Sequence, residues 1–271
     1  MEINMKKILI LFVAMILALS CVSCSKSREN AKYAKNGLEY VVNEDNESCT
    51  VVGMGKCTDT VVEVPEKIGK YSVTVIGEEA FCAGRYDSCA EIVEVILPEG
   101  LVSIKTGAFA RDEKLLSINI PSTVTEIGSH AFEYCKSLKE ISLPIGISEI
   151  GAQTFMSCTS LESILIPDGV KKIGASAFNG CEKLDGIVIP ESVTEIGDRA
   201  FSASGIRYAR VGAKIKKIGK NAFSLCDNFE NFYYAGTLSQ WREVECDGTW
   251  SDENGVFYCA DIEFPISDLY E

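Results

Sequence analysis

Hydrophobic and polar positions recur along this chain with a period of 23 residues. Prolines mark the period most simply, because Pro98, Pro121, Pro144, Pro167 and Pro190 are each 23 residues apart. Three more columns keep the same spacing: the Ile-Gly pairs that begin at Ile127, Ile150, Ile173 and Ile196, the phenylalanines Phe132, Phe155, Phe178 and Phe201, and the cysteines Cys135, Cys158 and Cys181.

Each repeat divides into short structural steps. Leu138, Ile141 and Leu143 are predicted to face inward, and the alternation of Ile141 and Leu143 with polar residues predicts a half-buried strand. Pro144 ends that strand because proline has no N–H to donate. A second apolar step lines the opposite wall, where Gly151 is expected to permit a turn. The Ala-Phe segment is predicted to form one helical or 3₁₀ turn that buries its phenylalanine.

A fixed period between 20 and 29 residues with leucine-type columns is the signature of a leucine-rich-repeat solenoid. We therefore predict a β-rich solenoid of 23-residue repeats, with one short strand and one helical or 3₁₀ turn per coil. The repeats are expected over residues 65–234. One coil cannot bury its apolar face alone, so β caps are predicted at residues 37–64 and 235–271.

The first residues carry a targeting pattern. Lys6 and Lys7 precede an apolar run that is too short for a comfortable membrane span, which indicates a signal peptide over residues 1–24. A small residue stands before each of Cys21 and Cys24, as in a bacterial lipobox, and either cysteine is a candidate for acylation. An ordinary secretory signal is the alternative. Residues 25–36 are polar and are predicted to form a tether.

The repeats also resemble a known family. The stretches IPSTVTEIGSHAFEYCKSL, IPDGVKKIGASAFNGCEKL and IPESVTEIGDRAF are similar to the BspA-like (Treponema pallidum-type) leucine-rich repeats of bacterial surface proteins, and the likeness runs from about Gly37 to Trp241. The resemblance implies the solenoid fold, and it implies adhesion or host contact as a use. It implies no shared set of binding residues.

Composition narrows the classes of function. The formal charge of −13 argues against nucleic acid, which selects a basic face. His130 is the one histidine, and no catalytic triad, paired carboxylates or phosphate loop is found, so an enzyme is only a distant alternative. No cofactor and no metal are expected, because the cysteine column has one residue per coil and zinc sites place theirs at short spacing.

Three pairs of cysteines lie close together outside the column: Cys49 with Cys57, Cys82 with Cys89, and Cys246 with Cys259. Export would permit disulfides, and free thiols are the other reading. Charged residues alternate in another column, at Glu149, Lys172, Glu195 and Lys217, and this pattern predicts an ion ladder on stacked coils.

Binding residues are expected on the outward side of the strands. Outward Ile96, Leu165 and Val188 are unusual for a solvated sheet and favour a protein-contact surface; the alternative is that neighbouring side chains cover them. Arginine and tyrosine are enriched at binding hot spots, which adds Arg207, Tyr208, Arg210 and Tyr233 to the candidate face.

The expected function is therefore that of an exported, lipid-anchored protein on the outer surface of the bacterial cell envelope. It would bind proteins or glycans, with its membrane contact made through the N-terminal lipid. A structural or scaffolding lipoprotein inside the envelope is the alternative.

Overall fold

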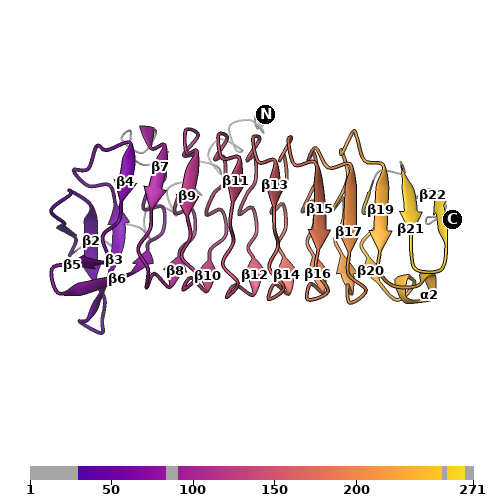
Figure 1. The fold of residues 1–271 in the computed structure, drawn as a ribbon, viewed down its shortest axis with the longest axis horizontal. Coiled ribbons are helices and arrows are strands. Elements are labelled where there is room, and N and C mark those ends of the chain that lie inside the picture. The colour runs from indigo at the N-terminus through magenta and orange to yellow at the C-terminus, as the bar shows by residue number, and fades with distance from the viewer. Residues whose placement is uncertain (1–29, 84–90, 252–254, 266–271) are drawn as a thin grey trace, which may run out of the picture.

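The chain forms an elongated stack of coils, in which successive repeats lie side by side along one axis (Figure 1). The computed structural model describes residues 30–83, 91–251 and 255–265. Each coil of the repeat region contributes strands to two ladders, and neighbouring coils pair in parallel. The predicted solenoid is confirmed. Its coils contain two short strands rather than one, because the second apolar step also pairs with its neighbours.

The front ladder carries the strand predicted from the leucine-isoleucine alternation. Its parallel strands are β4 (Val61–Glu63), β7 (Glu94–Ile96), β9 (Ser117–Asn119), β11 (Glu140–Ile141), β13 (Ser163–Ile164), β15 (Gly186–Ile189), β17 (Tyr208–Val211), β19 (Asn231–Tyr234) and β21 (Val256–Tyr258). The register between β11 and β13 joins Glu140 to Ser163, which is one repeat. The period of the sequence therefore sets the pairing.

The back ladder is formed by the second apolar step. Its strands are β3 (Ser48–Gly53), β6 (Tyr71–Ile76), β8 (Ser103–Ile104), β10 (Glu126–Ile127), β12 (Glu149–Ile150), β14 (Lys172–Ile173), β16 (Glu195–Ile196), β18 (Lys217–Ile218) and β20 (Glu245–Cys246). The register brings Glu149, Lys172, Glu195 and Lys217 side by side, as predicted. Lys172 contacts Glu195 at 3.0 Å.

Antiparallel strands lie at both ends of the rod. At the N-terminal end, β1 (Lys32–Tyr33) pairs with β2 (Glu39–Val42), β2 pairs with β3, and β5 (Lys67–Ile68) pairs with β6. At the C-terminal end, β22 (Glu263–Pro265) pairs with β21, and α2 (Leu238–Trp241) is a four-residue helix. The assignment of these ends as caps stays a prediction.

The predicted helical or 3₁₀ turn around the phenylalanine is wrong. The Ala131 N–H bonds the Gly128 carbonyl within its own coil, whereas the next N–H, of Phe132, bonds Thr154 in the following coil. His130 and Tyr134 have φ near 60°, as the third residue of a type II turn requires. Successive turns form here instead of a helix, because every second N–H group donates its hydrogen bond to a carbonyl of the following coil.

The glycine of the Ile-Gly pair has a different role from the predicted one. Gly174 does not have a positive φ. A Cβ placed on it would lie 2.5 Å from the Ala152 nitrogen of the preceding coil, a separation that no side chain tolerates. Glycine is needed at this position for close approach of two coils rather than for a turn.

Aromatic rings run through the core as a continuous stack. Successive ring centroids are 5.1–5.5 Å apart with interplanar angles of at most 13°, and the seven rings belong to Phe81, Phe109, Phe132, Phe155, Phe178, Phe201 and Phe223. Offset stacking at this distance is favourable beyond the area that each ring buries. The phenylalanine column therefore stabilises each coil against the next, and holds the front ladder rigid.

Candidate binding face

The outward side chains of the front ladder form one line along the rod, which we call the outward column. Its members are Ile96, Asn119, Ser142, Leu165, Val188, Arg210, Tyr233 and Tyr258. Adjacent strands pair Ile96 with Asn119, Val188 with Arg210, and Tyr233 with Tyr258. The predicted apolar and hot-spot positions thus lie on one surface, with the exception of Arg207.

Apolar side chains in this column are open to solvent. Leu165 is 78% exposed, Val188 52% and Ile96 41%. The alternative that neighbouring side chains cover these residues is therefore wrong. Leu165 and Val188 lie on successive coils and form an exposed apolar pair on the outward side of the front ladder. Exposed apolar side chains that lie together are typical of a contact surface.

A shallow groove runs over the central strands from Ile96 to Leu165 and includes Asn119 and Ser142. The amide of Asn119 is hydrogen-bonded through both its oxygen and its nitrogen, because its Oδ1 accepts from the Leu97 N–H at 2.8 Å and its Nδ2 donates to the Leu97 carbonyl at 3.1 Å. Asn119 therefore braces β7 against β9. The groove offers apolar contact and the Ser142 hydroxyl to a partner.

Aromatic and cationic groups gather at the C-terminal part of the column. The Arg210 guanidinium carbon lies 4.5 Å from the ring centroid of Tyr233 and 5.9 Å from that of Tyr208. The opposite face of Tyr233 stacks on Tyr258, with centroids 4.8 Å apart. Sequence analysis missed Tyr258, because its spacing of 25 residues from Tyr233 departs from the repeat.

Arg207 does not join this group. It precedes β17, and its guanidinium forms a two-pronged contact with the Asp185 carboxylate at 2.7 and 2.8 Å. Hydrogen bonds from Arg207 hold the pKa of Asp185 below its usual range. Arg207 is therefore paired with a residue one coil earlier, and its place on the candidate binding face stays a prediction.

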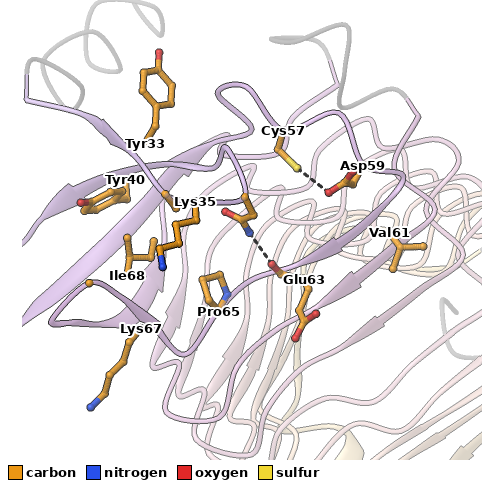
Figure 2. A pocket seen from close by; sticks show the side chains of 13 residues that line it. Tyr33, Lys35, Tyr40, Cys57, Asp59, Val61, Glu63, Pro65, Lys67 and Ile68 are labelled. Carbon is orange, nitrogen blue, oxygen red and sulfur yellow. Dashed lines mark hydrogen bonds between the residues drawn. The ribbon is translucent and has the colours of Figure 1, made fainter.

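A second groove lies at the N-terminal end, beside the edge of β4 (Figure 2). Tyr33, Lys35 and Tyr40 approach it from the hairpin side, and Val61 and Glu63 from β4. The Asn36 side chain donates to the Glu63 carbonyl at 3.1 Å and so covers part of the strand edge. Nothing in the repeat pattern predicted this groove.

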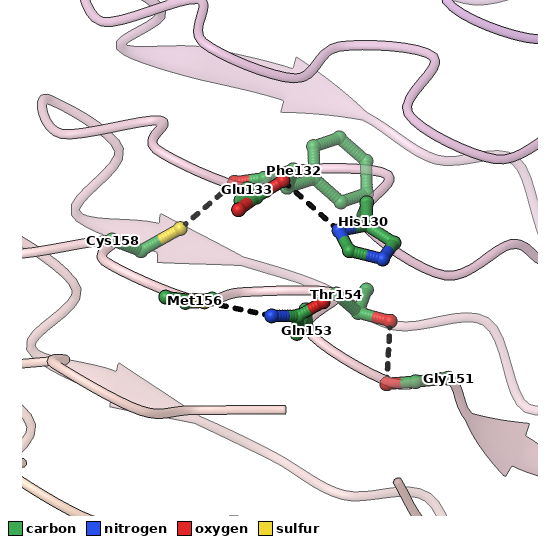
Figure 3. A network of polar contacts seen from close by, with 8 residues as sticks. All are labelled: His130, Phe132, Glu133, Gly151, Gln153, Thr154, Met156 and Cys158. Atoms are coloured by element: carbon green, nitrogen blue, oxygen red, sulfur yellow. Dashed lines mark hydrogen bonds and ion pairs between the residues drawn. The ribbon is translucent and has the colours of Figure 1, made fainter. Parts of the chain in front are cut away.

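His130 takes part in a local contact. Its Nδ1 lies 3.0 Å from Glu133 Oε2, while the Cys158 thiol donates to the Phe132 carbonyl at 3.1 Å (Figure 3). Burial raises the pKa of Cys158 to about 12, so this thiol stays protonated and is a poor nucleophile. The arrangement braces neighbouring coils and supplies no base beside a nucleophile.

The cysteine column lies in the core. Cys135, Cys158 and Cys181 are buried free thiols, and each donates to a phenylalanine carbonyl at 3.1–3.2 Å. Cys49, Cys57, Cys246 and Cys259 are also free thiols in the structure. Cys89, Cys21 and Cys24 lie outside the described residues, so the Cys82–Cys89 pair and both lipidation candidates stay predictions.

Within residues 30–83, 91–251 and 255–265 there is no group of three or more histidine, cysteine or acidic side chains arranged to hold a metal ion. In the same ranges no helix has the length and apolar character needed to span a bilayer.

Parallel ladders, a 23-residue register and an exposed outward column define a leucine-rich-repeat solenoid, a class whose members generally present extended binding surfaces. Residues 66–164 and 148–249 match the family model of the BspA type leucine-rich repeat region in six copies. The chain therefore belongs to the BspA-type leucine-rich repeat family.

Solved structures agree with that assignment. A leucine-rich repeat protein of Treponema pallidum is 24% identical, with a TM-score of 0.50 over 83% of this chain and 86% of that one. A leucine-rich repeat protein of Bacteroides ovatus is 27% identical, with a TM-score of 0.52 over 83% of this chain and 55% of that one. No curated protein matches the chain.

Proposed function

We propose that this chain is an exported binding protein, anchored to the bacterial cell envelope by a lipid on Cys21 or Cys24, whose outward column takes a protein partner. The observation that carries the proposal is the exposed pair Leu165 and Val188, which adjoins Arg210 and Tyr233 on one rigid surface. Apolar anchors beside arginine and tyrosine are the composition of interface hot spots.

The solenoid supports this use physically. The stacked phenylalanines fix the positions of the coils, so the outward column is ordered before a partner arrives. A preorganised surface loses less conformational entropy on binding than a flexible one. Membership of the BspA-type family supports the proposal that the use is adhesion or host contact and that the protein is displayed on the outer surface.

Protease treatment of intact cells tests the location. An antibody against residues after Ser25 follows the protein, and a periplasmic protein serves as the control for envelope integrity. Loss of the antibody signal with an intact control is expected. Protection until the envelope is opened would contradict surface display and favour the scaffolding lipoprotein inside the envelope.

A further inference from the structure

Arg210 differs from the other cation at this end of the front ladder. Arg207 is paired with Asp185 at 2.7 Å, whereas Arg210 has no ion pair within residues 30–83, 91–251 and 255–265 and its guanidinium lies near two tyrosine rings. The carboxylate that lines the same groove, Glu191, accepts the Ala213 N–H at 2.9 Å. A guanidinium charge is thus presented to solvent without a partner of its own.

The rings around Arg210 hold it in place. Tyr233 lies on one side and is itself backed by Tyr258 at 4.8 Å. Tyr208, two residues earlier on the same strand, has its ring centroid 5.9 Å from the guanidinium carbon of Arg210, and its ring covers Gly186, where an added Cβ would come within 2.4 Å of the ring. Contacts of guanidinium with tyrosine faces are favourable, so the side chain is ordered in advance of binding.

The ligand chemistry follows from these contacts. A planar guanidinium pairs best with a carboxylate or another planar anion, through two parallel hydrogen bonds. The surface next to Arg210 along the column is aliphatic, with Val188 52% and Leu165 78% exposed. A partner that fits both features has an acidic side chain close to aliphatic ones.

Peptide is favoured over an acidic sugar by the tyrosines. Sugars are held on aromatic side chains through a free ring face. Tyr233 is contacted by Arg210 and by Tyr258, and the ring of Tyr208 lies over Gly186. The adjoining groove is lined by aliphatic residues as well as by tyrosines and one carboxylate: Val188, Ile189, Pro190, Val211, Ala235, Tyr233, Tyr234 and Glu191. Its aliphatic members suit aliphatic side chains.

We propose that Arg210 is the anion-recognition residue of the outward column, and that it binds the carboxylate of an acidic side chain in an aliphatic peptide segment of the partner protein. This inference rests on the proposed function, because it specifies which partner chemistry the column accepts. The chain as a whole carries a charge of −13, so long-range repulsion opposes an acidic partner, and binding depends on the local contact between the Arg210 guanidinium and the partner's carboxylate.

Arginine Nε–Hε NMR tests the assignment directly, because the chain has seven arginines and their signals can be followed one by one. The probe is a blocked peptide, acetyl-LVSESG-amide, and its glutamine twin, acetyl-LVSQSG-amide. The acidic peptide is expected to shift the Arg210 signal to saturation, with an affinity at least fivefold above that of the twin. The affinity is expected to fall as the salt concentration rises.

Two variants make the test specific. Arg210→Gln is expected to abolish the difference between the two peptides. Arg199→Gln is the matched control, since Arg199 lies on a turn at φ 55° where the equivalent residue of another coil is Gln153 at φ 57°, and it is expected to leave binding unchanged.

The inference would be overturned if both peptides shifted the Arg210 signal equally, or if the acidic peptide did not shift it at all. A hyaluronan hexasaccharide that shifts Arg210 while the acidic peptide does not would overturn it in favour of an acidic glycan. Protease shaving is independent of this titration, so failure of the peptide to bind and failure of surface display are separate outcomes.

Discussion

Stacking of the phenylalanine column predicts a measurable coupling between neighbouring coils. Phe155 lies 5.5 Å from Phe132 and 5.4 Å from Phe178, ring centroid to centroid. Each such pair contributes about 0.5–1.5 kcal/mol beyond its buried area. Phe155→Leu keeps an apolar side chain but loses both pairs, and is therefore expected to destabilise the protein by about 1–3 kcal/mol. Phe155→Ala also leaves a cavity and is expected to cost about 3–5 kcal/mol.

A double-mutant cycle separates ring stacking from loss of volume. Phe132 and Phe155 are in contact, and replacing both by leucine is expected to give a coupling energy of about 0.5–1.5 kcal/mol. Phe109 and Phe178 are separated by the rings of Phe132 and Phe155 and share no stacking partner. Their effects are expected to add to within about 0.5 kcal/mol.

Equilibrium urea unfolding, followed by circular dichroism, provides the free energies. The data are fitted with a nearest-neighbour model, because solenoid coils contact only their neighbours and need not unfold in one step. Coupling for the distant pair as large as for the adjacent pair would refute the reasoning, as would a Phe155→Leu protein as stable as the wild type.

Three further predictions concern single positions. Asp112 occupies the cysteine column with both carboxylate oxygens buried, and burial raises its pKa well above the usual value. Because the pKa of Asp112 is raised in the folded state, the stability present at acidic pH is lost as the pH rises through that pKa. Asp112→Cys should therefore flatten the pH dependence of stability from pH 4 to 8 and stabilise the protein at pH 8 by about 1–3 kcal/mol. An unchanged urea midpoint would contradict this prediction. Gly174→Ala should destabilise the protein by about 1–3 kcal/mol in thermal unfolding. Gly151→Ala should cost less, because the Cβ added there meets its nearest atom at 3.1 Å. Equal losses of stability in the two variants would count against close approach as the cause. Cys158, with a pKa of about 12, should react with iodoacetamide at pH 8 only after the protein unfolds. Mass spectrometry of the peptide that contains Cys158 measures the modification, and modification of the native protein would contradict the prediction.

Much of the fold could be predicted because the repeat restricts it. The spacing of Pro144 and Pro167 is the spacing of the strand register, so the front ladder and its inward residues followed from the sequence. The second strand of each coil did not, since a two-residue strand such as β12 is too short for alternation to be recognised.

The turns were harder to foresee. His130, Gln153 and Ser176 adopt left-handed φ values of 55–60°, a region where glycine and asparagine are the usual residues. Their side chains carry no signal for it. The conformation is imposed by hydrogen bonds to the next coil, such as that from His130 to Ala152, and such contacts between coils are invisible to a local pattern.

The candidate face was foreseen in part. The period placed Leu165, Val188, Arg210 and Tyr233 in one line. The ion pair of Arg207 was not foreseen, although the acidic residue 22 positions earlier, Asp185, was a signal that it would be paired one coil away. The contacts of Arg210 with the rings of Tyr208 and Tyr233 depend on side-chain conformation, which the repeat spacing does not give.

Site-specific photo-crosslinking tests the central claim, that the outward column binds a protein partner. A benzophenone amino acid replaces Leu165, which is 78% exposed on the front ladder. The matched control replaces Glu149, an exposed residue of β12 on the back ladder. Cells carrying either variant are irradiated alone and in contact with host cells. We expect a discrete protein adduct from position 165 and none from position 149. No adduct from position 165 under either condition, or the same adduct from both positions, would contradict the claim.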